Sequence, residues 1–125
     1  MHSIKFSYLY RDAGNYKKWA DVVFSNPDGL ALEAVTKALK DAFLQDGLFI
    51  AHQIRIPGAF LFDQGDVSSD DHCFHELDSV EASFEVPNDG HSRSITEFIA
   101  EVNREAQRGW MAFDPHDRQP QRVSG

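Results

Sequence analysis

The chain has 125 residues, of which 42% are hydrophobic and 12% aromatic, and a formal net charge of −8 at pH 7. This length leaves room for one domain with a core of its own, and the hydrophobic content excludes global disorder. The negative charge disfavours direct binding to nucleic acid or to an anionic membrane, and it permits a basic protein partner.

Cysteine content and hydropathy indicate the compartment. The single cysteine, Cys73, cannot form an internal disulfide, which is typical of a reducing compartment. The N-terminus lacks a basic region followed by an apolar run, and no apolar segment approaches the about 18 residues of a membrane-spanning helix. We therefore expect a cytoplasmic protein without a signal peptide.

The first half of the chain predicts a hairpin, a helix and a strand. Residues 4–10 and 19–24 alternate between apolar and polar side chains around an Ala-Gly-Asn turn, which predicts an antiparallel hairpin. Apolar residues then recur at helical spacing over 32–43, with Gly47 placed to end the helix. Residues 48–56 alternate again and predict a strand with His52 on its apolar face, where it would be a buried, neutral core histidine. The short apolar run at 59–62 predicts a strand or a buried turn.

The second half predicts a strand, a helix and a tail. In residues 79–86 the apolar side chains, which end with Phe84 and Val86, should face inward and the glutamates outward. Ser94 and Glu97 form a capping-box pattern that opens a helix ending at Gly109. We therefore predict an α+β fold of order ββαβ(β)βα, with two helices on a mostly antiparallel sheet of four to five strands. A single domain should span residues 1–113, and the polar residues 114–125 should form a flexible tail.

The segment 63–89 carries nine acidic residues and no Lys or Arg. Its centre, DDHCFHELD, holds the carboxylates that we expect to bind a basic partner: Asp70, Asp71, Glu76 and Asp78. A solvated acidic loop without a partner is the alternative interpretation of this pattern.

The same segment contains four residues of types that bind transition metals, namely His72, Cys73, His75 and Glu76. A helix would place the two histidines and Glu76 on one face, whereas a strand would place Cys73 and His75 together. The spacing matches neither a CxxC pair nor HExxH, so zinc or another divalent metal is an alternative beside a polar cluster at a sheet edge. Cys73 is a poor catalytic thiol, because the surrounding carboxylates would raise its pKa.

Two stretches, IKFSYLYRDAGNYKKW and DDHCFHELDSVE, together with Ile56-Pro57, resemble a small family of uncharacterised bacterial proteins of this length. The resemblance covers about residues 4–86. It implies that the chain is a complete domain, and it carries over no functional residue.

The sequence thus favours a small acidic, non-enzymatic interaction module of the inhibitor, immunity or anti-defence type, with a basic protein partner and no cofactor. The alternative is a metal- or small-ligand-binding protein, with hydrolysis as one activity open to it, which uses the His/Cys/Glu cluster. A third interpretation is a homodimer joined through strand edges or through residues 110–113.

Overall fold

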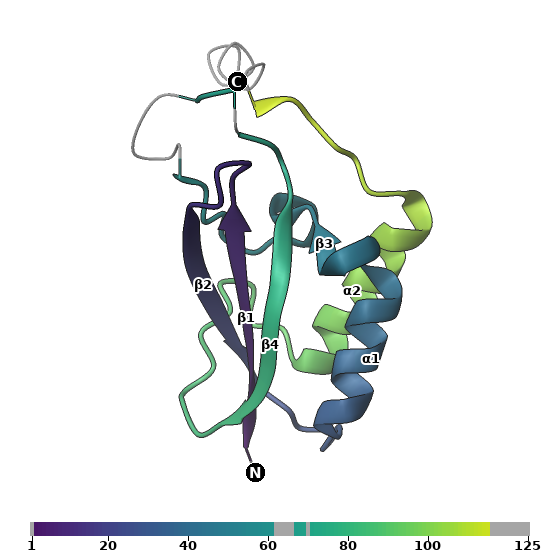
Figure 1. Ribbon diagram of the computed structural model, residues 1–125. Helices are drawn as coiled ribbons and strands as arrows, with labels where there is room; N and C mark the ends of the chain where they lie inside the picture. The colour runs from purple at the N-terminus through teal and green to yellow at the C-terminus, as the bar shows by residue number, and fades with distance from the viewer. Residues whose placement is uncertain (1, 62–66, 70, 116–125) are drawn as a thin grey trace.

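In the computed structural model, which describes residues 2–61, 67–69 and 71–115, the first two strands form the predicted hairpin (Figure 1). β1 (Ser3–Arg11) pairs antiparallel with β2 (Lys17–Phe24), from Ile4 opposite Phe24 to Arg11 opposite Lys17. The alternating pattern places the aromatic side chains of β1 on one face, where they are fully buried.

The sheet has four strands in the order β2-β1-β4-β3. β4 (His75–Ser83) pairs antiparallel with the other edge of β1, with an irregularity in register between Ser7 and Tyr8. β3 (Leu48–Phe49) pairs with β4 only at Glu76 and His75. The predicted α+β class and element order are confirmed, with four strands in the described part of the chain.

Both helices, α1 (Leu32–Ala42) and α2 (Ile95–Arg108), lie on one side of the sheet (Figure 1). The predicted capping box of α2 is present, because the Ser94 side chain accepts from the Glu97 N–H and the Glu97 side chain accepts from the Ser94 N–H. Neither described helix has the length and apolar character that a membrane crossing requires.

The predicted strand over 48–56 is wrong beyond Phe49. The chain instead forms two short 3-10 turns around β3, η1 (Gln45–Gly47) and η2 (Ala51–Ile54), and Arg55 ends the second with a left-handed φ of 59°. A 3-10 turn has about three residues per turn, so side chains no longer alternate between two faces. His52 is consequently exposed, and the prediction of a core histidine is wrong.

The predicted strand over 79–86 is shifted along the chain. β4 begins four residues earlier, at His75, and ends at Ser83, whose hydroxyl accepts from the Glu85 N–H in a local turn. Phe84 and Val86 were expected to face inward, but they are 93% and 82% exposed. The chain has left the sheet by then and pairs through Asn88 with the backbone of Val23.

Candidate functional site

Two of the four predicted binding carboxylates are held in contacts with β1. Asp71 accepts a hydrogen bond of 2.7 Å from the Tyr10 hydroxyl, and Glu76 accepts from Arg11 Nη2 at 2.7 Å and from Nε at 3.1 Å. Asp78 is exposed, and Asp70 lies outside the described residues. Of the three described carboxylates, Asp71 and Glu76 therefore bind side chains of β1, and Asp78 has no described Lys or Arg within ion-pair distance.

Both ring nitrogens of His72 form hydrogen bonds within the chain. Its Nδ1 accepts from the Phe74 N–H at 3.0 Å, and its Nε2 lies 2.6 Å from the Arg11 carbonyl oxygen. Because Nδ1 accepts, the proton belongs on Nε2, which donates to Arg11. These contacts join the segment before β4 to the end of β1.

His75 is fully buried among the rings of Tyr8, Tyr10, Phe49 and Phe60, with ring centroids 4.5 to 6.1 Å from its own. Its Nε2 accepts from the Ala59 N–H at 2.8 Å, and its Nδ1 has no partner among the described residues. Burial, with a smaller contribution from His72, lowers the pKa of His75 to about 4. The ring is therefore neutral at physiological pH and part of the core.

Cys73 is also buried, and its Sγ accepts from the Phe113 N–H at 3.4 Å. Burial raises the pKa of this thiol, which disfavours the thiolate that nucleophilic chemistry would need.

The candidate metal ligands point to separate surroundings. His75 lies in the core, whereas Glu76 pairs with Arg11, and no group of three or more His, Cys, Asp or Glu side chains within the described ranges is placed to hold a metal ion. The metal interpretation therefore gains no geometric support from this part of the chain.

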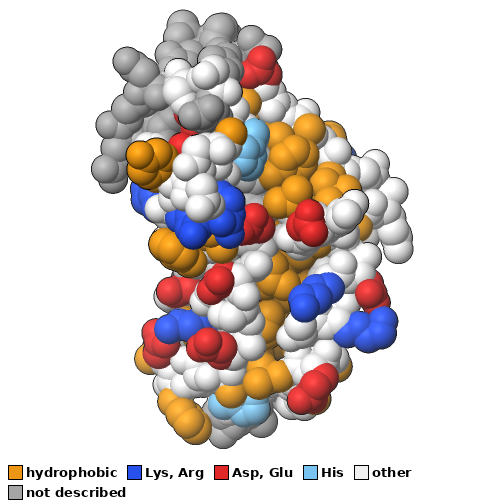
Figure 2. All heavy atoms as spheres, viewed as in Figure 1, with side chains coloured by type: hydrophobic (Ala, Val, Ile, Leu, Met, Phe, Trp, Pro, Cys, Tyr) orange, Lys and Arg blue, Asp and Glu red, His pale blue; other side chains and the backbone are white. Residues whose placement is uncertain are grey.

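A groove of about 550 Å³ lies between β4 and the C-terminal end of α1. Its lining is formed by Thr36, Lys40, Phe43, Leu44, Gln45, Asp46, Gly47, Leu77, Asp78, Ser79 and Val80. Figure 2 shows hydrophobic side chains along the face between the sheet and α1, with both acidic and basic side chains on either side of them. The sequence analysis did not predict this groove. Leu77 and Val80 share the core face at a spacing of three, whereas a regular strand places every second residue on one face. This spacing indicates the irregularity in β4.

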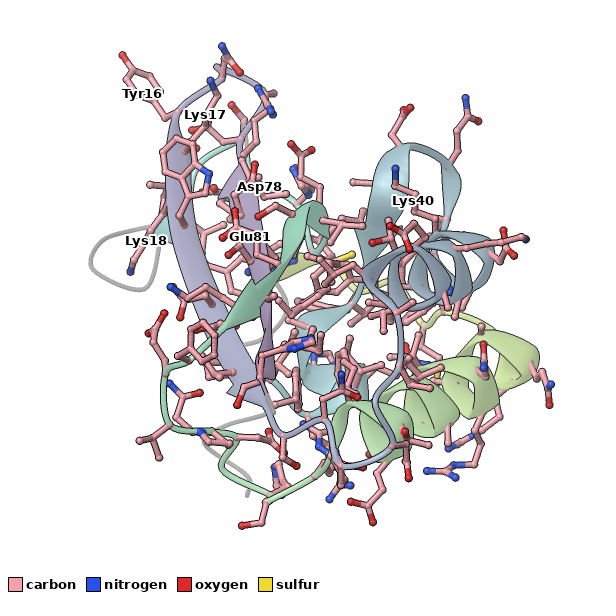
Figure 3. The ribbon with its side chains drawn as sticks, turned by 90° about the horizontal axis from the view of Figure 1, so that it is seen from below. Tyr16, Lys17, Lys18, Lys40, Asp78 and Glu81 are labelled. Carbon is pink, nitrogen blue, oxygen red and sulfur yellow. The ribbon has the colours of Figure 1, made fainter. Side chains whose placement is uncertain are left out.

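Exposed carboxylates accompany this groove. Asp78 on β4 and Asp46 in η1 line the groove together with Lys40 of α1, and Glu81 lies further along β4, opposite Lys5 of β1 (Figure 3). All three carboxylates are exposed, and none has a described Lys or Arg within ion-pair distance. This arrangement differs from that of Glu76, whose charge is already matched by Arg11.

A second groove, of about 540 Å³, lies near the exposed His52 and His91. Its one cation among the described lining residues is Arg55, whose Nη2 and Nε bind the two carboxylate oxygens of Glu101 at 2.6 and 2.7 Å. This paired contact uses the guanidinium, whereas Asp21, which also lines the second groove, is exposed and has no described Lys or Arg within ion-pair distance.

Comparisons of the chain with protein-family models, with curated proteins and with solved structures give no match. Function is therefore inferred from the chain's own residues.

Proposed function

We propose that this protein is a small acidic, non-enzymatic interaction module that binds a basic partner protein through Asp78, Glu81 and Asp46. The supporting observation is that Asp78 and Asp46 are exposed and line one groove, that Glu81 is exposed further along β4, and that none of the three has a described Lys or Arg within ion-pair distance. Of the carboxylates expected from the sequence, Asp78 belongs to this set, whereas Asp71 and Glu76 already have partners on β1.

Unmatched surface charge acts at a distance. Carboxylates without a neighbouring cation attract a basic surface during diffusional encounter and orient it on arrival, and salt screens this attraction. The net charge of −8 adds to the same field. These properties suit an inhibitor, immunity or anti-defence factor whose target is a basic protein, and the lone buried cysteine suits a reducing cytoplasm.

Two exposed apolar side chains strengthen the proposal. Phe84 and Val86 follow directly after β4 and are 93% and 82% exposed. Aromatic side chains supply much of the binding energy in protein interfaces, whereas charges at the rim mainly set rate and specificity. Phe84 lies three residues beyond Glu81 and six beyond Asp78, so exposed carboxylates and an exposed aromatic side chain follow one another along the chain, as expected of a docking surface.

The test compares two double variants of equal charge. Asp78→Asn with Glu81→Gln removes two carboxylates from the proposed surface, and Asp28→Asn with Glu33→Gln removes two exposed carboxylates that do not line the groove. Immobilised wild-type protein should retain a basic protein from an extract of the native host. The affinity between the two proteins should fall steeply as the salt concentration rises.

The purified partner should bind the first variant at least about ten-fold more weakly and the second nearly as well as wild type. Binding that is independent of salt, or that survives in the first variant, would refute the proposal.

A further inference from the structure

One edge of β4 is paired with another described strand only at its start. β3 pairs with it only at His75 and Glu76, so from Asp78 to Ser83 no described strand lies on the side away from β1. No backbone hydrogen bond from another described segment reaches this stretch either. Along such an edge, alternate residues present an N–H and a C=O to whatever lies beside them.

The groove runs beside this open edge. Phe43, Leu44, Leu77 and Val80 give it an apolar lining, and η1 lies against β4 at Leu77. A Cβ built on Gly47, whose φ is +74°, would lie 3.3 Å from the Leu77 Cβ, so the glycine permits this close approach. The edge is therefore open beyond Leu77, with apolar side chains beside it.

From this geometry, and resting on the proposed function, we propose that an extended basic segment of the partner adds to the sheet as a strand along β4. The open edge would supply the backbone hydrogen bonds, and the apolar lining would receive alternate side chains of the segment. Asp78 and Asp46 complement basic residues in that segment, and Lys40 is the only cation among the described residues of the lining.

A second copy of the chain is the competing occupant. The outer edge of β2 carries Lys17 and Lys18, labelled in Figure 3, which would complement Asp78 and Glu81. Pairing β2 of one copy with β4 of another is head-to-tail, so it would leave the same edge free on the next copy and continue without closing. A segment of another protein is therefore the favoured occupant.

The probe is a synthetic peptide of alternating Lys and Val with blocked ends. Its matched control is the same peptide methylated along its backbone nitrogens, which keeps the charge and side chains but removes the hydrogen-bond donors. At low salt, the unmodified peptide should shift the amide resonances of residues 78–83 and slow their hydrogen exchange. The methylated peptide should bind at least about ten-fold more weakly, because several hydrogen bonds are lost together.

Each other result overturns a defined part of the inference. Equal, salt-sensitive binding of both peptides would refute strand addition and leave the acidic docking surface standing. If neither peptide binds, both strand addition and the acidic docking surface are refuted. A mass of the protein alone that rises with concentration in light scattering, and falls in the Asp78→Asn and Glu81→Gln double variant, would assign the edge to a second copy.

A variant pair tests the groove itself. Leu44 and Met111 are 40% and 54% exposed, so replacing either with Ser is compatible with folding, but only Leu44 lines the groove. Leu44→Ser should weaken binding of the unmodified peptide several-fold, and Met111→Ser should not change it. Unchanged binding by Leu44→Ser would refute the role of the apolar lining, and a dispersed amide spectrum verifies that each variant is folded.

Discussion

Acidification should destabilise this protein through His75 before its carboxylates titrate. The ring is fully buried and its folded pKa is about 4, against 6.5 for the free side chain, so the folded state favours the neutral form. Well above pH 6.5 the ring is neutral in both states and its contribution to stability is complete. As the pH falls below 6.5, the unfolded chain takes up the proton first and stability is lost until the pH reaches about 4.

The magnitude follows from the two pKa values. One pH unit is worth about 1.4 kcal/mol, so a shift from 6.5 to about 4 gives a full loss of about 3 kcal/mol, of which about 2 kcal/mol falls between pH 6.5 and about pH 5. Carboxylates contribute little in this window. Hydrogen bonds from Arg55, for example, hold the pKa of Glu101 below its ordinary value of 4.5.

Urea unfolding followed by circular dichroism at pH 6.5 and about pH 5 measures this loss. His75→Gln does not titrate, and its side-chain oxygen can replace Nε2 as the acceptor for the Ala59 N–H. This variant should be less stable overall but should lose little further stability on acidification. His91→Gln, a change at an exposed histidine, should lose as much as wild type. A His75→Gln protein with the wild-type pH dependence would show that the reasoning is wrong.

Three further outcomes are expected. Arg93→Gln should lower the free energy of unfolding by about 3 kcal/mol or more in urea, because the guanidinium bridges the buried carboxylates of Asp89 and Glu101. Phe84→Ser should leave the free energy of unfolding within about 0.5 kcal/mol of wild type while weakening partner binding, since the ring is 93% exposed. Cys73 should react with a thiol reagent at least about a hundred-fold more slowly in the folded protein than in urea, because the thiol is buried and its pKa is raised.

Matched changes test these expectations. Arg104→Gln removes an exposed guanidinium and should cost less than about 0.5 kcal/mol, so an equal loss in both arginine variants would contradict a special role for Arg93. A large drop in stability for Phe84→Ser would mean that this ring is packed in solution. Rapid modification of Cys73 in the folded protein would mean that the thiol is accessible.

Short-range sequence patterns correctly predicted the β1–β2 hairpin and the start of α2. The hairpin follows from alternation around a turn, and the start of α2 follows from Ser94 and Glu97, which lie within one helical turn. The exposure of His52 could not be predicted from local patterns, because the apolar and polar residues still alternate in the sequence where the backbone has changed to a 3-10 turn. The alternation over 79–86 also predicted a buried Phe84, but a local turn at Ser83 ends the strand before this residue.

The candidate site was harder to predict, because its charges are matched by distant residues. Asp71 and Glu76 look like members of an acidic surface until Tyr10 and Arg11 are placed beside them, and these partners are 61 and 65 residues away in sequence. The groove beside Asp78 depends on how far β3 extends, which nothing in its own residues specifies. The net acidity was evident from composition, but which carboxylates remain unmatched depends on tertiary contacts.

The central position of β1 has a consequence for biosynthesis. The ribosome makes β1 first, yet one of its two neighbours, β4, begins only at His75. Until then the nascent chain holds a hairpin whose aromatic face is not yet packed against most of the later elements. One edge of β1 is also unpaired. Such a state is prone to association with other nascent chains. Because so many native contacts join distant parts of the chain, folding should be slow for a protein of this size, and a chaperone that shields the hairpin should raise the yield.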